Sequence, residues 1–209
     1  MKRMIISNIG GGGNHLRVLC LLDKSFDLGK LTQKPKLDFM LDEVYSDDRD
    51  WHNWLEREWR YHEIFNDQIL FTHPTNYPHK DGEMEDIINN DEINPILYLM
   101  RDPESCYRHY LKLNSSLNSR SKEQFLKDTD NDSLVMNYIS KKKQKVKIMQ
   151  GDFLFNPKLQ DEKIAEINRF FKIDIDINQA QQVHEKWYNL NRKAEKNIVK
   201  DIAKIYEEV

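Results

Sequence analysis

The sequence predicts an α/β fold in three layers, with a mostly parallel sheet flanked by helices. Short apolar runs alternate along the chain with longer segments whose apolar residues recur every three to four positions. Four consecutive glycines, 10–13, separate the first apolar run from the first of these segments. Two later apolar runs end abruptly, one at His73-Pro74 and one at Arg101-Asp102-Pro103. This alternation is typical of parallel strands joined by helical crossovers.

Length and composition indicate one domain that spans residues 1–209. Hydrophobic residues make up 39% of the chain and aromatic residues 11%, enough to fill a core. The two cysteines, Cys20 and Cys106, exclude a disulfide scaffold and have no metal-ligand spacing. The net charge of −3 disfavours a nucleic-acid partner, and the longest apolar runs, of five residues, are too short for a membrane span. We therefore expect a cytoplasmic protein without metal, and the Ile-, Asn- and Lys-rich composition suggests a microbial or viral source.

The elements follow in order from the apolar pattern. Four segments read as buried strands, and these are 4–9, 68–72, 95–100 and 146–150. Five segments read as helical, and these are 15–22, 51–65, 104–113, a segment with Ile164, Ile167, Phe170 and Phe171 on one side, and 178–208 as one helix or two. A short helix is expected around 83–89, a helical piece within the loop 115–132, and irregular chain over 23–50.

Three polar features are expected at one edge of the sheet. The glycine run follows the first strand, His73 follows the second and Arg101 follows the third. Ligands of open parallel sheets bind outside the carboxyl ends of the strands. The sequence therefore predicts that the glycine loop, His73 and Arg101 form a binding site together.

The glycine loop is predicted to bind an anion. Glycines let backbone N–H groups point inward, and the following helix adds the positive end of its dipole. The loop matches neither GxxxxGK[ST] nor GxGxxG, because Asn14 and His15 follow Gly13. A flexible tight turn is the alternative interpretation.

His73 and Arg101 are candidates for chemistry and for anion binding. The ordinary pKa of histidine suits a general base at neutral pH, although a packed histidine is an equally good interpretation of His73. Arg101 follows a strongly apolar strand, so its charge needs a partner, either Asp102 within the turn or an anionic ligand. His109 lies eight residues further along, on the next helix, and is expected to face the same pocket.

Four segments, in order, resemble the sulfotransferase family that uses PAPS (3′-phosphoadenosine-5′-phosphosulfate). Residues 5–16, IISNIGGGGNHL, resemble its 5′-phosphosulfate loop, and ILFTHP at 69–74 resembles a strand that ends in the catalytic histidine. ILYLMRDP at 96–103 resembles its 3′-phosphate strand and turn. The stretch 146–157 and the helix after it resemble a later strand–helix unit.

The resemblance implies a P-loop-like sulfotransferase fold and transfer of a sulfuryl group from PAPS to a hydroxyl or amine of a small-molecule or glycan acceptor, without metal. It makes His73 the catalytic base. The cofactor-binding residues it implies are Gly10, Gly11, Gly12, Gly13, Asn14, His15, Arg17, Arg101 and His109.

The chain departs from the family pattern at several positions. The loop has no lysine, for which Arg17 is the expected substitute, and Asp152 stands where a Glu-Asp pair is usual. The C-terminal glycine-rich loop is replaced by Trp187-Tyr188-Asn189 and Arg192. Two alternatives stay open, a protein of this fold that binds nucleotide without transfer, and a P-loop-type kinase or nucleotide-binding protein.

Overall fold

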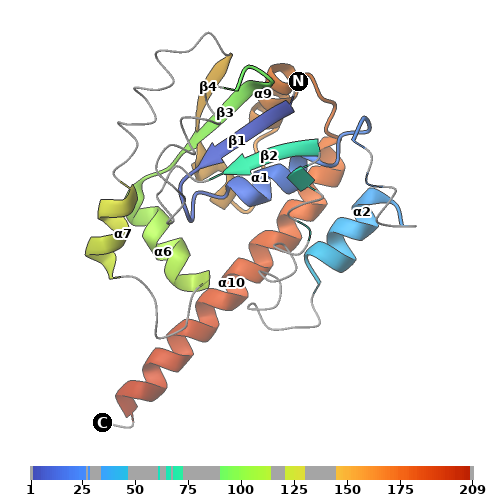
Figure 1. Cartoon of the computed structure of the whole chain (residues 1–209). Coiled ribbons are helices and arrows are strands. Elements are labelled where there is room, and N and C mark those ends of the chain that lie inside the picture. Colours follow the sequence, from blue (N-terminus) through green and yellow to red (C-terminus); the bar gives the residue numbers. More distant parts are fainter. Residues whose placement is uncertain are drawn as a thin grey trace.

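The computed structural model describes residues 2–26, 28, 34–46, 61, 65–66, 68–72, 90–113, 121–129 and 145–207. Within them the chain forms an α/β fold around a four-stranded, all-parallel sheet with strand order β2-β1-β3-β4 (Figure 1). The prediction of a parallel sheet flanked by helices is confirmed. The strands are β1 (Lys2–Ser7), β2 (Ile69–Thr72), β3 (Ile93–Met100) and β4 (Val146–Gln150).

Helical elements follow the strands in sequence. The α-helices are α1 (Gly13–Cys20), α2 (Lys36–Phe39), α6 (Pro103–Leu113), α7 (Lys122–Thr129), α9 (Asp161–Phe171) and α10 (Ile177–Glu207). A π-helical turn, η1 (Met40–Val44), continues α2, and a 3₁₀ helix, η2 (Gly151–Phe155), follows directly after β4. In Figure 1 the C-terminal part of α10 extends away from the sheet.

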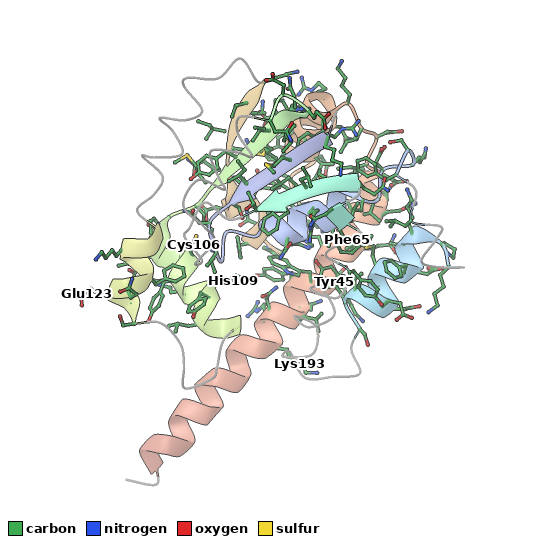
Figure 2. All side chains as sticks on the ribbon, in the orientation of Figure 1. Tyr45, Phe65, Cys106, His109, Glu123 and Lys193 are labelled. Carbon is green, nitrogen blue, oxygen red and sulfur yellow. The ribbon has the colours of Figure 1, made fainter. Side chains whose placement is uncertain are left out.

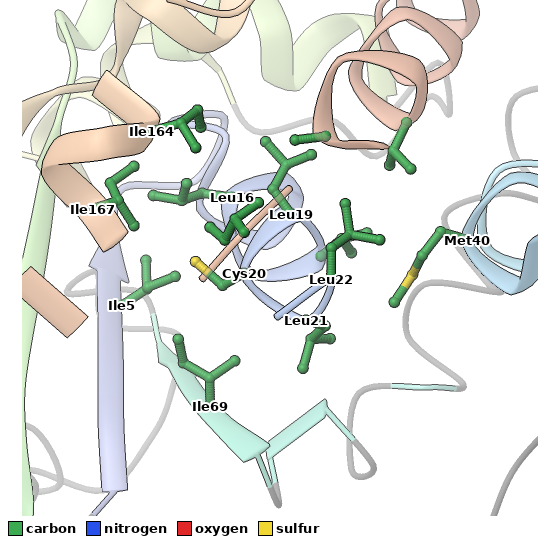
Figure 3. Packing of buried hydrophobic residues seen from close by; sticks show 14 of the residues in the cluster. Ile5, Leu16, Leu19, Cys20, Leu21, Leu22, Met40, Ile69, Ile164 and Ile167 are labelled. Atoms are coloured by element: carbon green, nitrogen blue, oxygen red, sulfur yellow. The ribbon is translucent and has the colours of Figure 1, made fainter. Parts of the chain in front are cut away.

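The alternation of side chains along the strands divides the core between the two faces of the sheet. On β1, Ile5 joins the large cluster with α1, α9 and α10, whereas Met4 and Ile6 join a smaller cluster on the other face. Figure 3 shows Ile5 and Ile69 facing α1, with Ile167 of α9 next to Ile5. The inner strands β1 and β3 are therefore buried on both faces, as the apolar strands predicted.

Local sequence explains where the two C-terminal helices end and begin. After α9, Lys172 adopts a left-handed conformation with φ of 54°, and the N–H of Ile173 donates to the Asn168 carbonyl at 3.0 Å. The carboxylate of Asp176 then accepts the N–H groups of Asn178 and Gln179 at 2.8 and 3.2 Å. This is an N-cap, so α10 begins at Ile177.

Two expectations about the elements need correction or refinement. Residues 23–50 were expected to be irregular, but residues 36–44 are helical, because Phe39, Met40 and Val44 bury apolar side chains at near-helical spacing. Residues 177–207 form one continuous helix rather than two. The expected elements at 51–60 and 83–89 lie outside the described residues. Among the helices that the structure describes, none has the length and apolarity needed to cross a membrane.

Asp102 caps α6, and this cap has a measurable contribution to stability. Its Oδ2 accepts the N–H of Ser105 at 2.8 Å, and this hydrogen bond lowers the pKa of Asp102. Asp102→Ala is therefore expected to lower the free energy of unfolding by about 1 kcal/mol, the usual effect of losing an N-cap. The stabilisation is present above the pKa of an unfolded aspartate and disappears as pH falls through the lowered folded pKa. Urea unfolding at pH 7 and pH 3 measures it, and an unchanged free energy at pH 7 would contradict the assignment.

Candidate active site at the carboxyl edge of the sheet

The glycine loop connects β1, an inner strand of the sheet, to α1. Gly10 and Gly12 have φ of 79° and 84°, a left-handed conformation that glycine adopts without a Cβ penalty. The N–H of Gly11 donates to the Asn8 carbonyl at 2.8 Å, which closes the turn, and Gly12 is the N-cap residue of α1. No described side chain caps this helix, so the first amides of α1 have no intrahelical partner.

Packing accounts for glycine at two of these positions. A Cβ on Gly10 would overlap the Cys106 carbonyl oxygen of α6, because the two atoms would be only 2.3 Å apart. A Cβ on Gly13 would meet Ser7 Oγ at 2.2 Å and a ring carbon of Phe71 at 2.4 Å. The loop is therefore held between α6 and β2 as well as between β1 and α1, and its conformation is set by close backbone approach.

Arg101, at the end of β3, reaches the glycine loop. Its Nη1 donates to the Gly10 carbonyl at 3.1 Å and to the Ser105 carbonyl at 3.2 Å, and its Nε donates to Asp152 Oδ1 at 3.1 Å. Its guanidinium lies over the Phe155 ring, 3.3 Å from the centroid. The side chain is only 11% exposed, so these contacts fix a cation at the strand ends next to the loop.

The ion-pair partner of Arg101 is Asp152 and not Asp102, which the sequence left open as an alternative to an anionic ligand. Asp102 caps α6 through Ser105, whereas the ion pair of Arg101 is made with Asp152, the second residue of η2. The strand order explains this, because β4 lies beside β3 and the chain after β4 therefore returns to the same edge. The carboxylate of Asp152 is 64% exposed and pairs with an almost fully buried guanidinium.

His15 has a buried side chain and lies in a chain of hydrogen bonds. Its Nδ1 is 2.9 Å from the Tyr45 hydroxyl, and its Nε2 is 3.0 Å from Nδ1 of His184 on α10. The ring stacks on Trp187 with centroids 4.0 Å apart and an interplanar angle of 4°. Burial lowers the pKa of His15 well below 6.5, and the imidazoles of His184 and His109 lower it further. The His15 side chain is therefore occupied by these buried hydrogen bonds, and its backbone N–H lies in the first turn of α1.

Arg17 is also buried, one turn into α1. Its guanidinium donates to Asn14 Oδ1 at 2.9 Å and to Asn66 Oδ1 at 2.8 Å. The rings of Phe65 and Phe71 each have their centroid 5.3 Å from its guanidinium carbon. Through Asn14, Arg17 fixes the first turn of α1, so its described contacts connect it to the loop indirectly.

His109 lies on α6, eight residues after Arg101, and its place in a common pocket stays a prediction. Its ring packs edge-on against Phe155 with centroids 5.0 Å apart, and Arg101 contacts the same Phe155 ring. His109 is 6% exposed, and its ring is also 6.1 Å from that of Trp187. Figure 2 labels His109 and Tyr45, which come from α6 and from the end of η1. The Phe155 ring thus lies between Arg101 and His109, two of the expected site residues.

The structure brings together most of the residues singled out from sequence. Gly10, Gly12, Arg101 and His109 lie around η2 and the start of α6, and Asn14 and Arg17 are joined by a hydrogen bond. His73 lies outside the described residues, so its role as catalytic base stays a prediction. Within the ranges that the structure describes, no cluster of His, Cys, Asp and Glu has the arrangement of a metal site.

Sequence reasoning missed several residues that complete this region. Phe155, Tyr45 and His184 have no assigned role in the sequence analysis, and Trp187 enters it only as part of a stretch in place of a family loop. That stretch is helical, because 187–192 lie within α10. One signal was available, since Trp187 and His184 are three residues apart and therefore share a face of a helix.

Comparison of the sequence with protein-family models and with curated proteins finds no match in either case. The assignment of a function therefore depends on the geometry of the glycine loop and Arg101, together with the family resemblance of the segments that carry them.

Proposed function

We propose that the carboxyl edge of the sheet binds a phosphorylated nucleotide and that the protein is a PAPS-dependent sulfotransferase. One observation carries the proposal, the 3.1 Å contact of Arg101 Nη1 with the Gly10 carbonyl. It joins the guanidinium that follows β3 to the glycine loop, two residues before the N-cap of α1. Helix N-termini bind phosphate and sulfate, and arginine binds phosphate through two parallel hydrogen bonds. The two groups together suit a ligand with more than one anionic group.

The proposed reaction is transfer of a sulfuryl group to a hydroxyl or amine. The acceptor atom attacks sulfur, the bond between sulfur and the 5′-phosphate oxygen breaks, and adenosine 3′,5′-bisphosphate leaves. His73 takes the acceptor proton in this proposal. The amides of Gly12–Asn14 bind the 5′-phosphosulfate, and Arg101 binds the 3′-phosphate, so catalysis consists of positioning and charge stabilisation.

The missing loop lysine favours a second candidate, a protein that binds the nucleotide without transferring sulfuryl. Residues 8–14 contain no lysine, and the nearest following cation, Arg17, is buried between Phe65 and Phe71. The loop amides and Arg101 still support nucleotide binding under this candidate, and only the chemical step differs.

Ligand-induced stabilisation tests the binding step. Adenosine 3′,5′-bisphosphate is expected to raise the apparent stability by about 2.7 kcal/mol at a hundredfold excess over Kd, whereas AMP and ATP–Mg²⁺ give much less. A thermal-shift titration with the three ligands measures this. A shift with ATP–Mg²⁺ alone would favour a kinase-like nucleotide site instead, and no shift with any of them would remove the proposal.

A transfer assay separates the two candidates. The purified chain is incubated with PAPS and a panel of hydroxyl, amine and glycan acceptors, and sulfated product is detected by mass spectrometry. Product above the level without protein supports the transferase. Binding of the bisphosphate with no product from any acceptor supports the binding protein.

A further inference from the structure

A buried chain of hydrogen bonds joins four segments that are far apart in the sequence. It runs from the hydroxyl of Tyr45, after η1, to His15 on α1, then to His184 on α10, and ends at the Asn156 carbonyl, where His184 Nε2 lies at 2.7 Å. Trp187, one turn along α10, covers the His15 ring. His15 thus connects the first turn of the glycine-loop helix to the C-terminal helix.

The carbonyl at the end of the chain determines where each proton lies. The carbonyl of Asn156 accepts only, so Nε2 of His184 carries a proton. In neutral His184, Nδ1 is then an acceptor, so Nε2 of His15 is the donor between the two rings. Nδ1 of His15 is left as an acceptor for the Tyr45 hydroxyl. Both histidines are therefore Nε2–H tautomers when neutral.

Extra protons disrupt this arrangement. One added proton reverses or removes the tyrosine hydrogen bond and leaves a charge among apolar and aromatic side chains. Two added protons set N–H against N–H across a gap of 3.0 Å between two cations. The titratable groups that face His15 are Tyr45, His184 and His109, and those that face His184 are His15 and Tyr188. Among the groups named here there is no carboxylate that would stabilise the added charge.

We propose that Tyr45, His15 and His184 form an acid-sensitive latch that holds α10 on the first turn of α1. Above the ordinary pKa of histidine the hydrogen bonds of the latch are all formed and α10 is docked. Below that pH, histidines in the undocked or unfolded chain bind protons, whereas the docked histidines stay neutral. Proton binding therefore favours the undocked state, and docking weakens as pH falls. The lowered pKa values of His15 and His184, caused mainly by burial, have the direction that this requires. The latch acts on the same helix turn as the proposed nucleotide site but does not depend on that function.

The decisive variant is His184→Asn. The Oδ1 of asparagine takes the place of Nδ1 and accepts from His15, but it does not bind a proton in this pH range. For each histidine kept neutral, the unfolding equilibrium constant rises up to about tenfold per pH unit below the unfolded pKa. The variant is expected to unfold more readily at pH 8, because the hydrogen bond to Asn156 is lost. Between pH 6.5 and 5 its unfolding equilibrium constant should change less steeply with pH than that of the unmodified chain. A slope equal to that of the unmodified chain would overturn the latch.

Val183→Ala is the matched control, because Val183 is fully buried beside His184 and does not titrate. It should lower stability equally at every pH and keep the slope. A slope as shallow as that of His184→Asn would show that packing on α10, rather than the histidines, sets the acid dependence, and would overturn the proposal.

Two measurements on the unmodified chain keep the test independent of the variants. Long-range ¹H–¹⁵N NMR at pH 8 should show the Nε2–H tautomer for both His15 and His184, and the opposite tautomer for either would overturn the chain. Hydrogen exchange, corrected for intrinsic rates, should show protection of 180–191 falling before that of β1 and β3 as pH is lowered to 5. Equal loss in the sheet and in α10 would mean global acid unfolding rather than a latch.

Discussion

Gly10→Ala is expected to lower the free energy of unfolding by about 3 kcal/mol. Two causes add. The φ of 79° costs an L-residue roughly 1–2 kcal/mol, and a methyl group forced into packed structure costs about 1–3 kcal/mol more. The added Cβ would lie 2.3 Å from the Cys106 carbonyl, which is helix backbone and cannot turn aside as a side chain can. Urea denaturation at pH 7 measures the loss.

Gly12→Ala separates the two causes. Its φ of 84° is nearly that of Gly10, but the nearest atoms to its Cβ are side-chain carbons of Leu154 and Phe155, at 3.1 Å and beyond. We expect only the backbone cost, about 1–2 kcal/mol. Equal losses for the two variants would show that the loop does not pack against α6 as closely as the geometry indicates.

Arg101→Ala is the second large effect, and it concerns both stability and ligand binding. Loss of the hydrogen bonds to Gly10, Ser105 and Asp152 is expected to lower the free energy of unfolding by about 2 kcal/mol, since bonds to a charged group contribute roughly 1.5–3 kcal/mol each and water replaces part of them. Affinity for adenosine 3′,5′-bisphosphate should fall by at least about 1.5 kcal/mol. Calorimetric titration at 15 °C, after circular dichroism has shown that the variant is folded, measures the affinity.

Asp152→Asn is the matched control for Arg101. Asparagine keeps the Oδ1 acceptor for Arg101 Nε, and the Asp152 carboxylate is 64% exposed, so the stability should change by less than about 1 kcal/mol. If the bisphosphate takes the guanidinium from Asp152, the variant should bind the ligand at least as tightly as the unmodified chain. Weaker binding by Asp152→Asn, or unchanged binding by Arg101→Ala, would contradict the role given to Arg101.

The inner strands β1 and β3 were predictable because burial on both faces leaves a simple apolar signature. Strand β4 has the predicted bounds, 146–150, since it lies between a lysine run and Gly151. Strand β1 begins two residues earlier than expected, at Lys2. The charged Arg3 is compatible with the strand because its Nε donates to the Phe171 carbonyl at 2.7 Å. An apolar pattern does not reveal that the end of α9 lies beside the beginning of β1.

The interior of the candidate site was less predictable. His15 appeared as a polar residue after a glycine loop, a position where a ligand contact is a reasonable expectation. Its partners Tyr45 and His184 are 30 and 169 positions away, so no local pattern reveals them. Asp152 likewise meets Arg101 only because β3 and β4 are neighbours. Local sequence predicted which residues reach the edge of the sheet, and the strand order determined which of them meet.

Amide NMR of the glycine loop tests the central claim most directly. The ¹⁵N-labelled chain is titrated with adenosine 3′,5′-bisphosphate at pH 7.5, with AMP as the control ligand. Our account predicts saturable shifts of the backbone amides of Gly12–Asn14 and of the Arg101 Nε–H signal, larger than any shift in α9. Saturable shifts confined to another part of the chain, or none at millimolar ligand, would show that the carboxyl edge of the sheet is not a nucleotide site.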